Sequence, residues 1–80
     1  MRQEERVSIS VIADQVREYL CANPKATDTL EGIAGWWLSP AQGNADLEAI
    51  QQAIDLLVAR REMVRILSAD GQVFYARGLL

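Results

Sequence analysis

Residues 63–77 read MVRIL-SADG-QVFYAR, and this stretch decides the fold class. Its two outer runs are rich in β-branched and aromatic residues, and Asp-Gly between such runs predicts a β-hairpin. Gly71 can adopt the positive φ that the turn requires. Strand alternation places Phe74 and Tyr75 on opposite faces, and the pattern leaves open which of them points inward. Because an isolated hairpin is marginally stable in water, we expect this one to pack on helices.

The residues before the hairpin repeat their apolar positions at spacings of three and four, which predicts amphipathic helices. Three helices are expected, over residues 9–22, 28–38 and 45–61. The third has the clearest apolar stripe, formed by Leu47, Ile50, Ala53, Ile54, Leu57 and Val58. The pattern therefore predicts a layer of three helices against which the hairpin packs.

Polar residues and prolines mark where these helices begin and end. Ser8 is the expected N-cap of the first helix, and Asn23-Pro24 ends it. Asp28 followed by Glu31 resembles a capping box and predicts the start of the second helix. That helix contains Gly32 and Gly35, each costing about 1 kcal/mol relative to alanine. We therefore expect a close neighbour at these glycines.

The order helix, helix, turn, longer helix, hairpin resembles the winged-helix domain family over residues 8–77. The segments that carry the resemblance are residues 28–38, 45–61, 63–64 and 68–72. It implies a single α+β domain over residues 1–80, with a three-helix core and a C-terminal β-hairpin wing. Residues 25–27 stand where the family often has a short strand before the second helix.

One position departs from the family pattern at the corner between the third helix and the hairpin. Many winged helices have glycine there, and this chain has Glu62. If the corner keeps a left-handed residue, a residue other than glycine costs about 1 kcal/mol there. We therefore expect either a different corner or a loss of stability.

The resemblance implies DNA binding through the third helix and the wing, and the charge distribution argues against it. The chain has a net charge of −3, and residues 44–62 contribute two arginines against four acids. Phosphate contacts require lysine or arginine. Gln51 and Gln52 are candidate readers of adenine edges but lack cationic support nearby. The candidate DNA-binding residues of this alternative are Gln51, Gln52, Arg60, Arg61, Arg65 and Arg77.

Protein–protein contact is the function that we expect instead, with a protein partner or a second copy of the chain. Adjacent helical residues point about 100° apart, so Trp36 and Trp37 cannot both face one core. Trp37 aligns with the buried stripe, whereas Trp36 packs at its margin or anchors an interface. The candidate interface residues are Trp36, Gln51, Gln52, Asp55, Leu79 and Leu80.

Composition argues against catalysis, cofactors and metal binding. The chain has no histidine and one cysteine, which excludes the usual zinc sites and histidine-based nucleophiles. We expect Cys21 to be a buried small hydrophobe. No run approaches the roughly 18 apolar residues of a membrane span, and the N-terminus lacks the pattern of a signal peptide. The expectation is a non-enzymatic domain of the cytoplasm.

Overall fold

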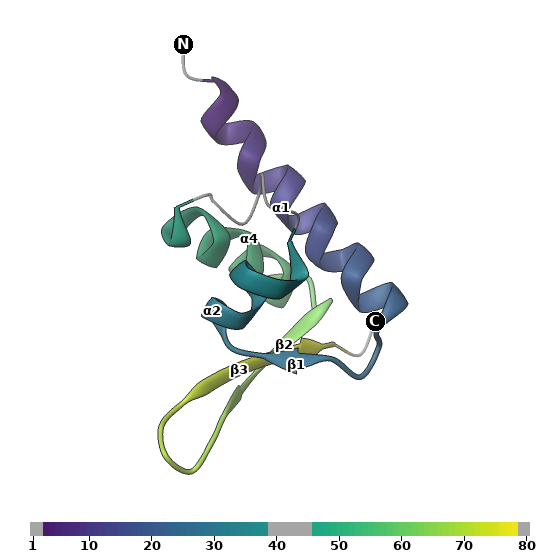
Figure 1. Ribbon diagram of the computed structural model, residues 1–80, viewed down its shortest axis with the longest axis vertical. Helices are drawn as coiled ribbons and strands as arrows, with labels where there is room; N and C mark the ends of the chain where they lie inside the picture. The colour runs from purple at the N-terminus through teal and green to yellow at the C-terminus, as the bar shows by residue number, and fades with distance from the viewer. Residues whose placement is uncertain (1–2, 39–45, 79–80) are drawn as a thin grey trace.

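The structure is a computed structural model that describes residues 3–38 and 46–78, with side chains from Ile9 onward. Within these residues, three helices and a three-stranded antiparallel sheet confirm the α+β class (Figure 1). The elements are α1 (Gln3–Ala22), β1 (Thr27–Asp28), α2 (Leu30–Gly32), η1 (Ile33–Trp37), α4 (Leu47–Ala59), β2 (Met63–Leu67) and β3 (Val73–Arg77). The segment α2 continues directly into η1, so these two form one helix.

Helix α1 begins earlier than the sequence predicts, and the expected N-cap at Ser8 is wrong. The preceding residues are good helix formers, so the helix extends through Ser8 to Gln3. Its N-terminal part projects beyond the rest of the molecule (Figure 1). Its end at Ala22 is as predicted, and the Asn23 backbone N–H donates to the Tyr19 carbonyl at 2.8 Å.

The N-cap of the second helix lies one residue later than the sequence predicts. Thr29 is the N-cap, and its hydroxyl accepts a hydrogen bond from the Gly32 N–H at 3.1 Å. Asp28 lies instead in β1, opposite Tyr75, and this pairing holds it in an extended conformation. An added Cβ at Gly32 would overlap the Asp28 carboxyl group, which confirms the close neighbour expected there. Open space surrounds the Cα of Gly35, and nothing in the structure explains that glycine.

Helix α4 ends in a tight cap that turns the chain into the hairpin. The Arg61 N–H donates to the Val58 carbonyl at 3.0 Å, and the Glu62 N–H donates to the Leu57 carbonyl at 2.9 Å. These two bonds form a Schellman motif, which requires a left-handed residue. That residue is Arg61, with φ 64°, and not Glu62 as the family pattern suggests. The strained position thus lies one residue before the expected one.

The hairpin forms where the sequence predicts it, and β3 lies between the other two strands. Strand β2 pairs with β3 from Met63 opposite Arg77 to Leu67 opposite Val73, and β1 pairs with the other edge of β3. Ser68 and Gln72 close a three-residue loop through a backbone bond of 2.8 Å. Gly71 has φ 89°, as the turn requires.

The inner face of the sheet and the helices enclose a single core. Tyr75 and Met63 point inward and are buried, which settles the choice that the sequence left between Phe74 and Tyr75. The predicted stripe of α4 is buried at Ile50, Ala53, Ile54 and Leu57. Leu47 is exposed, contrary to that prediction, because it lies in the first turn of α4, away from the packed part. The other core residues are Ile12, Ala13, Val16, Leu20, Ile33, Trp37 and Leu38.

Candidate functional site

The outer face of the hairpin is apolar and faces away from the helices. Val64 lies opposite Ala76, and Ile66 lies opposite Phe74, so these four side chains share one face. Val64 is 37% exposed and Ile66 is 43% exposed, although both lie in regular strands. The helices pack on the other face, where Tyr75 is buried (Figure 1). Exposed apolar side chains gathered on one face are typical of a contact surface.

Two further exposed apolar residues lie at the end of the hairpin farthest from the helices, on the opposite face, which Tyr75 shares. Leu67 is 70% exposed, and its partner Val73 is 36% exposed. Sequence reasoning missed the apolar outer face and this second pair, although a signal was present. A strand with one solvated face alternates apolar and polar residues, whereas residues 63–67 and 73–77 are apolar at most positions.

The two adjacent tryptophans have different environments, as their angular separation predicts. The Trp37 ring stacks on Tyr19 with a centroid distance of 4.6 Å and an interplanar angle of 15°. Trp36, the next residue toward the N-terminus, is 80% exposed. Both lie in η1, whose wider π-helical turn follows α2. Of the alternatives left for Trp36, packing at the margin of the core is therefore wrong, and its side chain is available for contact.

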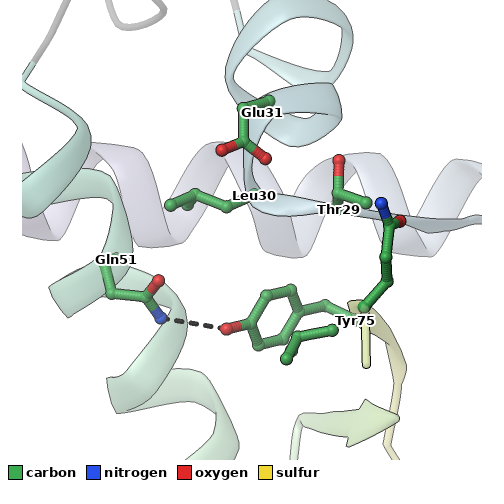
Figure 2. Close-up of a pocket in the computed structure, with 7 residues that line it drawn as sticks. Thr29, Leu30, Glu31, Gln51 and Tyr75 are labelled. Carbon is green, nitrogen blue, oxygen red and sulfur yellow. Dashed lines mark hydrogen bonds between the residues drawn. The ribbon is translucent and has the colours of Figure 1, made fainter. Parts of the chain in front are cut away.

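Gln51 and Asp55 belong to a chain of polar contacts across the sheet and α4. The Gln51 side-chain amide donates to the Tyr75 hydroxyl at 3.0 Å (Figure 2). It also donates to Asp55 Oδ1 at 2.9 Å. Asp55 also lies 3.7 Å from the Arg65 guanidinium. Gln51 therefore anchors the hydroxyl of a core tyrosine, whereas the neighbouring Gln52 is exposed. The Gln51 amide nitrogen therefore donates both of its hydrogen bonds within the protein.

A hollow of about 340 Å³ lies beside this hydrogen bond, between α2, α4 and β3 (Figure 2). Its wall includes Thr29, Glu31 and Tyr75. The Thr29 hydroxyl already caps the second helix, and the Tyr75 hydroxyl already accepts from Gln51. The hydroxyls of Thr29 and Tyr75 and the Gln51 amide are thus engaged in holding the fold.

The four candidate DNA-binding arginines do not gather on one surface. Arg61 and Arg65 line a groove beside β2, Arg60 lines a hollow against α1, and Arg77 lines another hollow with Cys21. Leu79 and Leu80, from the interface hypothesis, lie outside the described residues.

The corner after α4 is tied to α1 by an ion pair. Arg17 Nε donates to Glu62 Oε1 at 2.6 Å, and Arg17 Nη1 donates to Asp14 Oδ1 at 2.7 Å. The hydrogen bond from Arg17 holds the pKa of the Glu62 carboxyl below its ordinary value. The same pair raises the pKa of Arg17. Glu62 therefore acts as a link between α1 and the hairpin corner.

The hairpin tip has one carboxylate and no cation. The Ser68 hydroxyl donates to Asp70, and the Gln72 backbone N–H donates to the same carboxyl oxygen at 3.4 Å. These bonds, the first above all, hold the pKa of Asp70 below its ordinary value. The tip thus presents a negative charge where a wing in contact with phosphate needs a positive one.

Other chemistry is sparse in the part of the chain that the structure describes. Cys21 is exposed, so the expectation that it is buried is wrong; it follows Leu20 on α1 and points away from the core. No three potential metal ligands come together among the described residues. None of the described helices has the length and apolar character needed to cross a membrane.

Comparison with known proteins identifies no relative. The chain matches no family model, no curated protein and no solved structure.

Proposed function

We propose that this chain is a non-enzymatic winged-helix domain that acts through protein–protein contact, as an accessory or regulatory subunit. The observation that carries the proposal is the apolar outer face of the hairpin, with Val64 and Ile66 exposed on regular strands. Burying apolar surface contributes about 25 cal/mol per Å², so a partner that covers this face gains affinity from it. Trp36, 80% exposed, offers a second anchor of the kind found at interface hot spots.

The winged-helix part of the proposal is supported by element order and sheet order. A short strand precedes the second helix, as the family resemblance implies, and it pairs with the second strand of the C-terminal hairpin. The strand covers Thr27 and Asp28, which overlaps the expected position by one residue. The long third helix precedes the hairpin directly.

The alternative function, DNA binding through α4 and the wing, has less support. The Gln51 amide is engaged by Tyr75 and Asp55, and Asp46 and Glu48 occupy the start of α4. The hairpin tip adds Asp70 rather than a cation. An acidic helix and an acidic tip are the opposite of what phosphate contacts require.

A photocrosslinking experiment in the source cells tests the proposed function. A photoreactive amino acid replaces Trp36 or Ile66, and exposed Glu18 on α1 serves as the matched control position. We expect discrete protein adducts from positions 36 and 66 that the control position does not give. Adducts to nucleic acid alone, or the same adducts from all three positions, would contradict the proposal.

A titration with duplex DNA at low and moderate salt tests the alternative directly. We expect no binding that depends on the four arginines. Salt-sensitive binding that weakens when Arg60, Arg61, Arg65 and Arg77 are replaced by alanine would establish the alternative and overturn protein contact as the main function.

A further inference from the structure

Strand β2 has one edge paired with β3, and no strand lies beside its other edge among residues 3–38 and 46–78. The backbone bonds that join Ser68 to Gln72 and Glu62 to Gly78 fix which residues face β3. In an antiparallel pair such residues alternate, so Val64 and Ile66 direct their N–H and C=O groups toward β3. Met63, Arg65 and Leu67 therefore direct theirs toward the free edge, as the remaining three residues of β2.

This free edge lacks most of the devices that protect edge strands. Natural edges are blunted by charged side chains, proline, bulges or very short strands. β2 has five residues in unbroken register with β3, no proline, and Arg65 as its single charged residue. The opposite edge of the sheet is β1, which has two residues. β2 is thus the edge of this sheet that is suited to pair with another strand.

A groove of about 520 Å³ runs along the same edge. Three consecutive residues of β2, namely Met63, Val64 and Arg65, line it together with Val58 and Arg61 from the end of α4. The floor is apolar, and the two arginines supply positive charge at its border. Arg65 has one carboxylate nearby, Asp55 at 3.7 Å, and no ion pair joins Arg61 to a carboxylate among the described residues.

The Schellman cap that ends α4 fixes the backbone of Arg61, and its side chain lines this groove. Its φ of 64° lies in the left-handed region, where glycine is favoured and a large side chain is strained. Here the strained residue is a cation on the border of an apolar groove.

We propose that the free edge of β2 accepts an extended segment of a partner protein as an added strand, and that this segment alternates carboxylate and apolar side chains. The inference rests on the proposed function and specifies its partner. Backbone groups of Met63, Arg65 and Leu67 pair with the segment. Its apolar side chains extend the outer face beside Val64 and Ile66, and its carboxylates reach Arg61 and Arg65.

Charge and size favour such a segment over a second copy of the chain. Pairing of two β2 edges centred on Arg65 places two like charges directly opposite each other, whereas a carboxylate of a partner segment is attracted to Arg65. A five-residue edge is about 17 Å long, and pairing along it covers a narrow strip of the surface. Each partner in a stable dimer buries a much larger surface, about 800 Å². The edge suits a peptide segment better than a symmetric dimer.

The probe is a fluorescein-labelled seven-residue peptide in which glutamate alternates with valine, and the control peptide has lysine in place of glutamate. We expect fluorescence anisotropy to show binding of the glutamate peptide at least about tenfold tighter than that of the control. Hydrogen exchange of the Met63, Arg65 and Leu67 amides should slow in the complex. The amides of Val64 and Ile66, already bonded to β3, should not change.

Two variants separate backbone pairing from charge recognition. Leu67→Pro removes an N–H that faces the free edge and leaves the β3 ladder intact, so it should abolish binding, whereas Leu67→Val should retain it. The double variant Arg61→Glu, Arg65→Glu should prefer the lysine peptide. If Leu67→Pro does not fold, this reversal still tests the proposal.

Equal binding of both peptides, or protection of Val64 and Ile66 instead, would overturn the added strand. Sedimentation velocity that shows a dimer in the wild type and a monomer in Leu67→Pro would assign the edge to a second copy and overturn the acidic segment. If the peptide fails while adducts from positions 36 and 66 persist, this inference is wrong and the proposed function stands. If the adducts fail as well, both are wrong.

Discussion

At the scale of single residues, Trp36 and Trp37 show how strongly adjacent positions can differ. Trp37 is stacked on Tyr19 and 7% exposed, whereas Trp36 is 80% exposed. Trp37→Ala should lower the free energy of unfolding by about 3–5 kcal/mol because it leaves a cavity in the core. Trp36→Ala should change it by less than about 0.5 kcal/mol. Urea unfolding followed by circular dichroism measures both, and equal losses would contradict the assignment.

Arg61 is the residue with the clearest conformational cost. Because glycine adopts a left-handed conformation without strain, Arg61→Gly should raise the free energy of unfolding by about 1 kcal/mol. Arg60, with φ −89°, gives a matched control, and glycine there should be destabilising. Thermal unfolding compares the two. Destabilisation by Arg61→Gly would mean that its side chain contributes more than the strain costs.

At the scale of elements, the corner after α4 and the end of β3 are held together through Gly78. Its N–H donates to the Glu62 carbonyl at 2.8 Å, and an added Cβ would overlap the Arg61 carbonyl oxygen. Gly78→Ala should therefore lower the free energy of unfolding by about 1–3 kcal/mol through overpacking. Gly35→Ala is the control, because open space surrounds its Cα. Urea denaturation of both variants gives the comparison, and equal effects would contradict it.

The Arg17–Glu62 pair joins α1 to the same corner and predicts a pH dependence. The pKa of Glu62 lies below its ordinary value of 4.5, so the pair stabilises the fold above that pH and is lost as the pH falls through the lowered pKa. Arg17 is more than a third exposed, so solvent screening limits the contribution to about 0.5 kcal/mol.

Glu62→Gln tests this pH dependence. It should lower the free energy of unfolding by about that amount at neutral pH, and the difference from the wild type should disappear at low pH. Urea unfolding at several pH values measures it, with exposed Glu18→Gln as the control. A difference that stays constant with pH would show that charge is not the cause.

The elements themselves were largely predictable, and their exact ends were not. Apolar periodicity predicts all three helices, and Asp-Gly predicts the hairpin, because both signals are local. The cap moves from Asp28 to Thr29 because Asp28 pairs with Tyr75, which is 47 positions away. Long-range pairing of this kind leaves no mark on the local pattern. Likewise, no local signal shows that Leu47 lies beyond the packed part of α4.

At the scale of the whole molecule, the candidate surfaces were only partly predictable. The angle between neighbouring helical residues anticipates the exposed Trp36, because that geometry is local. The groove between β2 and α4 depends on the corner at Arg61, and the dispersal of the arginines depends on how α1 and the sheet meet. The net charge of a segment therefore does not show where its charged side chains lie on the folded surface.

The central position of β3 also determines when the sheet can form during synthesis. Strands β1 and β2 do not pair with each other, and both pair with β3, which follows them in the chain. Proteins are synthesised from the N-terminus. The strands at residues 27–28 and 63–67 therefore have no strand to pair with until residues 73–77 have emerged from the ribosome. Helices α1 and α4 precede β3 in the chain, so Tyr75 is the last of the core residues to be synthesised.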